Sequence, residues 1–123
     1  MPSLHAVLLQ SDSGVAESLV AALSSCFDSV HLAHSLNELR TSIAQHRARV
    51  AILDLEKASL SDVKSLSGDF PGACIVCTHR CADEEMWTAA LNAGAADVCP
   101  TSDTAAILRA ALEHTSTSRT AAA

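Results

Sequence analysis

The chain has 123 residues, a length that suits one domain with one substantial core. Apolar residues make up 49% of it and aromatic residues only 2%, so Ala, Val, Leu and Ile must fill the core. That composition suits helices packed on a buried parallel sheet. The formal net charge is −6, and no basic cluster is present to displace counterions from a nucleic acid, which argues against direct DNA or RNA binding.

Apolar runs reach only about five residues, too short to cross a bilayer, and no basic segment leads into a long apolar one at the amino terminus. We therefore expect a cytoplasmic protein without a membrane segment. The five cysteines are an odd number in a chain without an export signal, which predicts reduced thiols that pack as small apolar residues.

Five short apolar runs alternate with five amphipathic stretches. Each run is apolar in its middle and ends in polar or turn residues, as strands buried on both faces do. The predicted strands are His5–Gln10, Val30–Ala33, Val50–Asp54, Cys74–Thr78 and Ala96–Cys99.

The intervening stretches show helical periodicity and start signals. The first places Val15, Leu19 and Leu23 on one stripe. Ser35 with Glu38 predicts a capping box at the start of the second, and Ser59 with Asp62 marks the start of the third. The fourth opens with the acidic run 83–85 and stops at Gly94, and the fifth runs from about Asp103 to His114.

This alternation predicts an α/β fold: a five-stranded parallel sheet of order 2-1-3-4-5, with helices on both faces. The expected domain covers residues 1–114, and a disordered polar tail or linker covers 115–123. Ligands of such sheets bind outside the carboxyl ends of the strands. The polar residues expected at this edge are Asp12, Asp54, Glu56, Thr78 and Thr101.

Three segments carry a family resemblance. VAILD at 50–54, CIVCT at 74–78 and LNAGAADV at 91–98 resemble the receiver domains of response regulators, the CheY-like domains of two-component signalling. The resemblance extends over nearly the whole chain, and Ala93-Gly94-Ala95 is its most specific local match. It implies a non-enzymatic signalling domain that accepts a phosphoryl group on Asp54.

The resemblance also assigns roles and partners. Asp12, Asp54 and the backbone carbonyl of Glu56 would hold Mg²⁺, which takes oxygen ligands, and Thr78 would contact the phosphoryl oxygens. The implied partners are a sensor histidine kinase or phosphotransfer protein and a downstream protein target. A homodimer through the fourth helix, fifth strand and fifth helix is also consistent with the resemblance.

Several positions depart from the family pattern. The Lys expected at the end of the fifth strand falls on Thr101 or, aligned on Pro100, on Cys99, and neither residue is a cation. Ser11 replaces one of two adjacent acids, and Val98 replaces an aromatic residue. These departures leave open a degenerate pseudo-receiver that acts by protein contacts without phosphorylation.

Other interpretations of single residues also remain open. Asp12 could instead cap the first helix, and Asp54 could be a cap at a strand end. Ser11-Asp12-Ser13-Gly14 loosely resembles a phosphate-binding loop, so a flavodoxin-like FMN-binding protein is a further alternative.

Thiol chemistry and metal binding are weaker hypotheses. Cys74 and Cys77 have the spacing of half a zinc site, but residues three apart on a strand face opposite ways. Buried thiols would also be unreactive. The six histidines show no spacing that predicts a cluster. Trp87 is expected to be half-buried packing or part of a partner surface.

Overall fold

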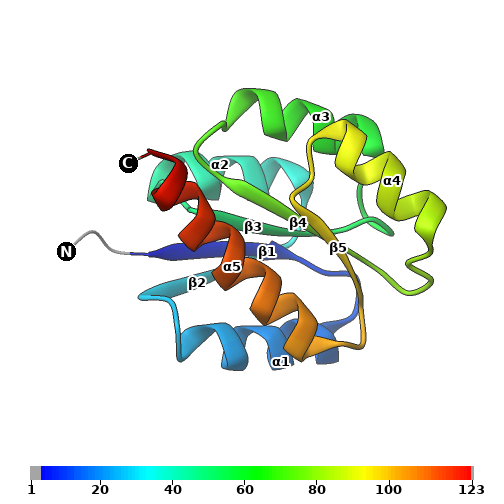
Figure 1. The fold of residues 1–123 in the computed structure, drawn as a ribbon. Helices are drawn as coiled ribbons and strands as arrows, with labels where there is room; N and C mark the ends of the chain where they lie inside the picture. Colours follow the sequence, from blue (N-terminus) through cyan, green and yellow to red (C-terminus); the bar gives the residue numbers. More distant parts are fainter. Residues whose placement is uncertain (1–3, 123) are drawn as a thin grey trace.

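The computed structural model describes the backbone of residues 4–122 and the side chains of residues 4–113. Its five parallel strands form one sheet in the order β2-β1-β3-β4-β5 (Figure 1), which confirms the predicted topology. The strands agree with the predicted runs to within one residue at each end: β1 His5–Leu9, β2 Ser29–Ala33, β3 Val50–Asp54, β4 Cys74–His79 and β5 Asp97–Pro100.

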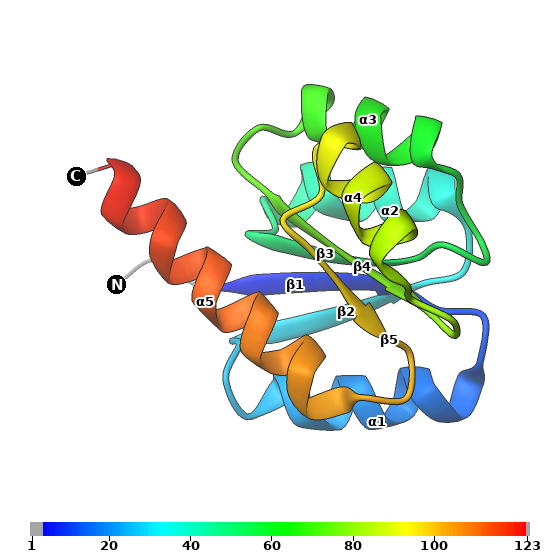
Figure 2. The same cartoon turned by 45° about the vertical axis from the view of Figure 1, so that its right-hand side comes forward.

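Helices cover both faces of the sheet (Figure 2), with α1 and α5 on one face and α2, α3 and α4 on the other. Their bounds are α1 Ser13–Ser24, α2 Leu36–His46, α3 Leu60–Asp69, α4 Glu84–Ala93 and α5 Thr104–Ala122. Strand β3 shows why helices must cover both faces of the sheet: its apolar side chains point alternately to one face and the other. Ala51 and Leu53 pack toward α2, α3 and α4, whereas Val50 and Ile52 pack toward α1 and α5.

Local capping sets the helix boundaries. The hydroxyl of Ser59 accepts a hydrogen bond from the Asp62 N–H, and the Asp62 carboxylate accepts from the Ser59 N–H, a complete capping box. At α2 only half of the predicted box forms: Ser35 accepts from the Glu38 N–H, while the Glu38 carboxylate accepts from the His34 N–H. Gly94 ends α4 in the left-handed conformation, at φ 115°.

Helix α5 is longer than predicted. The sequence places its end near His114, followed by a disordered tail, but the structure continues the helix to Ala122. The segment beyond His114 contains neither Gly nor Pro, so no residue in it is a strong helix breaker. Among the described residues, no helix combines the length and apolarity required to span a bilayer.

Candidate functional site

A cleft of about 340 Å³ opens at the carboxyl ends of β1, β3, β4 and β5, where the topology predicts a ligand site. Loops that follow four different strands meet there. The residues that line it are Ser11, Asp12, Val15, Glu56, Arg80, Thr101 and Ser102.

Asp54 ends β3 beneath this cleft and is fully buried. Its Oδ2 accepts hydrogen bonds from the Ser11 N–H at 2.8 Å and from the Ser11 hydroxyl at 2.5 Å. Its Oδ1 accepts from the Glu56 N–H at 2.9 Å. Both carboxylate oxygens therefore already have partners, as a buried carboxylate requires. Ser11 stands where the family pattern has an acid, and here it is a donor to Asp54.

Thr78 is the register partner of Asp54 on the neighbouring strand and is also fully buried. Its hydroxyl accepts a hydrogen bond from the Gln10 side-chain amide at 3.1 Å. Gln10, the last residue before the Ser11 loop, was not singled out from the sequence, although a polar residue after an apolar strand was a usable signal. Thr78 is thus beside Asp54 but is not part of the cleft lining.

Thr101, rather than Cys99, faces the cleft. Cys99 is buried against α1 and α5, whereas the Thr101 hydroxyl oxygen is buried at the cleft without a hydrogen-bond partner. Arg80, which the sequence places after the fourth strand without assigning it a role, also lines the cleft, and its guanidinium lies 3.2 Å from the Glu56 carboxylate. Arg80 follows β4 directly, so a cation at this edge could have been inferred from its position.

Asp12 serves as the N-cap of α1. Its Oδ1 accepts hydrogen bonds from the Gly14 N–H at 2.8 Å and from the Val15 N–H at 3.2 Å. The helix-capping interpretation of Asp12 is therefore confirmed, with the second carboxylate oxygen still available to another partner.

These contacts test whether the site fits Mg²⁺. The ion requires near-octahedral oxygen ligands whose lone pairs point at one centre. Here the lone pairs of Asp54 accept from three N–H and O–H donors, and an Asp12 oxygen caps α1. Within the described part of the chain, no group of three His, Cys, Asp or Glu residues is arranged to hold a metal ion. As arranged, both Asp54 oxygens and one Asp12 oxygen already accept hydrogen bonds, and the second Asp12 oxygen is the carboxylate oxygen of this pair that is open to a cation.

The cysteines differ in burial: Cys77 and Cys99 are buried, Cys74 is partly buried, and Cys26 and Cys81 are exposed. Cys74 packs toward α1 and α5 and Cys77 toward the opposite face, which confirms that the two cannot chelate together. Burial raises the pKa of the Cys77 thiol to about 12 and, with nearby acidic groups, that of Cys99 to about 11. No aromatic residue lines the cleft, so it offers no surface on which a flavin ring could stack.

Three of the six histidines pack together in the fold, although their spacing in the sequence gives no sign of it. His31 and His46 stack with ring centroids 3.7 Å apart, and His5 lies 6.0 Å from each. Ser29 bridges His5 and His31 through its hydroxyl. These residues lie at the start of β1, on β2 and at the end of α2, so only the folded chain brings them together. Burial, then His46 and His5, lower the pKa of His31.

No family model matches the sequence, and no curated protein matches it. Solved structures do match its fold. A CheY-like receiver domain from Methanospirillum hungatei superposes with a TM-score of 0.83 at 16% identity, over 97% of this chain and 98% of that one. A response regulator from Thermotoga maritima superposes with a TM-score of 0.82 at 16% identity, over 94% of this chain and 99% of that one.

A third match is a response regulator from Burkholderia pseudomallei that holds a phosphorylated aspartic acid, a calcium ion and citrate. Its TM-score is 0.77 at 19% identity, over 98% of this chain and 73% of that one. The chain therefore has the CheY-like fold of response regulator receiver domains. At these identities the similarity extends to the fold and leaves the chemistry of the site to its own residues.

Proposed function

We propose that the chain is a pseudo-receiver, a non-enzymatic signalling domain that acts through protein contacts without phosphorylation of Asp54. One observation carries the proposal: the Asp54 carboxylate is fully buried, and Ser11 donates both its N–H and its hydroxyl to a single oxygen of it. A phosphoryl group on this carboxylate would displace those bonds. It would also bring at least one further negative charge next to Asp12 and Glu56.

Charge at the cleft supports the same conclusion. Phosphoryl transfer depends on neutralising the charge of the incoming group, because the protein contributes mainly positioning and electrostatics. Thr101 is neutral where the family has a Lys. Arg80 lines the cleft, but it is engaged with Glu56 and its side chain is 77% exposed, which weakens any field it exerts.

Phosphorylation at Asp54 is the second candidate. It is favoured by the register pair of Asp54 and Thr78 at the carboxyl ends of β3 and β4, and by the phosphorylated aspartic acid of the Burkholderia pseudomallei protein. Under this candidate Asp54 accepts the phosphoryl group, Thr78 turns from Gln10 toward it, and a histidine kinase or phosphotransfer protein is the donor. Mg²⁺ would compete with the hydrogen-bond donors of Asp54, whereas the second carboxylate oxygen of Asp12 could bind it without loss of the helix cap.

One experiment separates the candidates. The wild-type protein is incubated with acetyl phosphate and Mg²⁺ and examined by intact-mass and peptide mass spectrometry. The pseudo-receiver proposal expects no adduct of roughly 80 Da, while a reactive receiver domain treated in parallel acquires one. A Ser11→Asp/Thr101→Lys double variant, which supplies the missing acid and cation, is expected to gain the adduct. An adduct mapped to Asp54 in the wild type would overturn the proposal and establish the second candidate.

We infer that the chain contacts its protein partners through the face formed by α4, β5 and α5. Trp87 on α4 is 45% exposed, and its indole N–H donates to the Asp97 carboxylate at 3.2 Å, which holds the ring at the surface. Exposed aromatic rings of this kind are enriched in interfaces. If the chain forms a homodimer through this face, sedimentation velocity should detect a dimer for the wild type and a monomer for Trp87→Ala. If the face binds a downstream target instead, both proteins should be monomers.

A further inference from the structure

A second pocket lies at the opposite edge of the sheet from Asp54. It has a volume of about 570 Å³, within the range of small-molecule sites, and it opens between the end of α2 and the loop that joins α3 to β4. Arg49 immediately precedes β3, so this pocket and the Asp54 cleft stand at the two ends of one strand.

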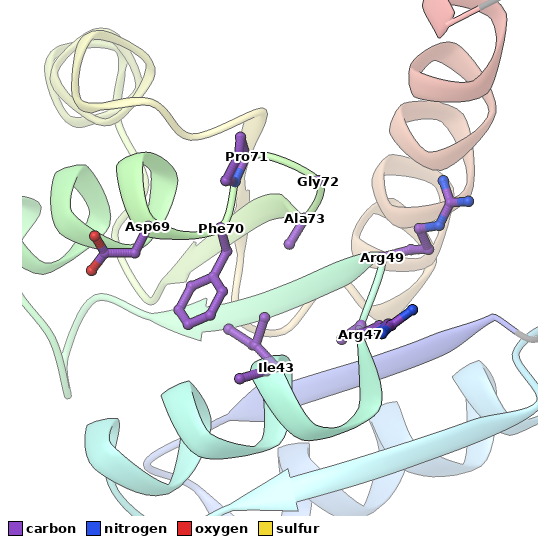
Figure 3. Close-up of a pocket in the computed structure, with 10 residues that line it drawn as sticks. Ile43, Arg47, Arg49, Asp69, Phe70, Pro71, Gly72 and Ala73 are labelled. Carbon is purple, nitrogen blue, oxygen red and sulfur yellow. The ribbon is translucent and has the colours of Figure 1, made fainter.

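The floor of this pocket is apolar. Ile43 and Ala48 are 2% and 4% exposed and belong to the core, and Phe70 and Ala73 pack against them. Figure 3 shows the Ile43 side chain and the Phe70 ring turned toward one another. The Arg40 guanidinium lies over that ring, 6.0 Å from its centre, at the outer limit of a cation–π contact.

The rim carries unpaired positive charge. Arg47 and Arg49 both line the pocket. The ion pairs of the described residues join Arg40 to Asp69 and Arg80 to Glu56, and neither involves these two arginines. Asp69, the acidic residue of the lining, is already neutralised by Arg40 at 2.8 Å, and Figure 3 shows its carboxylate pointing away from Arg47 and Arg49. In a chain of net charge −6, this is a local cationic site.

The backbone at Arg47 is an independent observation. Arg47 ends α2 at φ 52°, ψ 50°, the left-handed conformation that favours glycine, and it is the non-glycine residue with positive φ among those described. Gly94 occupies the equivalent position after α4. This conformation ends α2, because the Arg47 N–H bonds to the Ile43 carbonyl, and it places Arg47, rather than the glycine usual at such a position, at the edge of the pocket.

We propose that this pocket binds a small organic acid: a carboxylate attached to an apolar body. The Ile43, Ala48 and Phe70 floor removes the body from water. Figure 3 shows the Arg47 and Arg49 side chains extending away from this floor, so their guanidinium groups turn toward the pocket to pair with the carboxylate. Guanidinium is the side-chain group best suited to this pairing, because its planar N–H donors match two carboxylate oxygens. The site is separate from the Asp54 cleft and does not depend on whether Asp54 is phosphorylated.

Three matched probes test the ligand class by amide chemical-shift changes in two-dimensional NMR. 3-Phenylpropionate has both the body and the charge, propionate has the charge alone, and 3-phenylpropan-1-ol has the body alone. We expect saturable shifts for 3-phenylpropionate in residues 43–49 and 69–73, and at least about tenfold weaker binding of the other two. Binding of none of the three, equal binding of all three, or shifts centred elsewhere would overturn the proposal.

Variants separate binding from folding. Arg47→Gly is expected to raise the thermal midpoint, because glycine adopts the left-handed conformation without strain, and to weaken 3-phenylpropionate binding about tenfold. Arg49→Gln is expected to weaken binding without that stabilisation. Arg109→Gln, an equal charge change on the exposed surface of α5, is the matched control and should bind as the wild type does. If Arg47→Gly and Arg49→Gln bind as tightly as Arg109→Gln, the proposed site is wrong even where the wild type binds.

Discussion

Ser11 donates two hydrogen bonds to one carboxylate oxygen of Asp54, from its N–H at 2.8 Å and from its hydroxyl at 2.5 Å. The two residues are 43 positions apart: Ser11 lies in the loop that follows β1, and Asp54 is the last residue of β3. With the Glu56 N–H on the other oxygen, this pair turns a carboxylate at the usual phosphorylation position into a satisfied, buried group.

Replacing Ser11 with Ala is expected to lower the free energy of unfolding by about 1–3 kcal/mol, because the buried Asp54 carboxylate loses one of its three donors. Urea titration at neutral pH measures this. Ser13→Ala, an exposed position at the start of α1, is the control and should change stability by less than about 0.5 kcal/mol. Equal effects at the two serines would mean that the Ser11 hydroxyl does not support Asp54.

Replacing Asp12 tests its capping role separately from its charge. Asp12→Ala is expected to cost about 1 kcal/mol of stability, because the Gly14 and Val15 N–H groups lose their acceptor. Asp12→Asn keeps a capping oxygen and should stay within about 0.5 kcal/mol of the wild type. Thermal unfolding followed by circular dichroism compares them. A loss in Asp12→Asn as large as that in Asp12→Ala would assign the stabilisation to the charge instead.

Two glycines next to the α3–α4 contact are expected to respond in opposite directions. A Cβ at Gly94 would lie 2.4 Å from the Ser67 hydroxyl oxygen and 2.6 Å from its Cβ, on a backbone at φ 115°. Gly94→Ala should therefore destabilise by about 1–3 kcal/mol. Gly68 is helical with open space around it, so Gly68→Ala should stabilise by about 0.5–1 kcal/mol. The denaturant midpoints of the two variants measure these effects. A shift of both midpoints in the same direction would contradict the packing argument.

The stability of the protein is expected to fall as the pH decreases through the histidine range. Burial, His46 and His5 lower the pKa of His31 in the folded state, so between that pKa and about 6.5 the unfolded chain binds more protons at this position. The stability present above about pH 6.5 is thus lost as the pH falls below it. Unfolding titrations between pH 8 and pH 5 measure the slope. His46→Asn removes one of the charges facing His31 and should flatten that slope; a steeper slope in this variant would refute the cause assigned.

Thiol labelling is expected to divide the cysteines by exposure. At pH 8, iodoacetamide should modify the exposed Cys26 and Cys81 in the native protein and leave the buried Cys77 and Cys99 unmodified, because burial raises the pKa values of those two thiols to about 12 and about 11. In denaturant all should react. Peptide mass mapping over time distinguishes the sites. Rapid native labelling of Cys77 or Cys99 would revive the hypothesis of thiol chemistry.

Much of the fold was predictable because its signals are local. The apolar runs specify strands, and the Ser59–Asp62 capping box and the stop at Gly94 act within a few residues of the boundaries they set. Asp54 was predictable as the last residue of a buried strand, and the alternation of elements leaves one common sheet order. The length of α5 was not predictable, because its final turns contain neither a Gly nor a Pro that would end the helix.

Only the tertiary structure decided the contacts between residues that are far apart in the chain. The bonds from Ser11 to Asp54, the His5–His31–His46 cluster and the pocket bordered by Arg47 and Arg49 each join separate elements. No periodicity or spacing encodes them, since each depends on register, helix packing and loop path together. The sequence by itself determined where Asp54 would stand, and the folded chain determined that its carboxylate would be covered, because only there does the loop after β1 close over the end of β3.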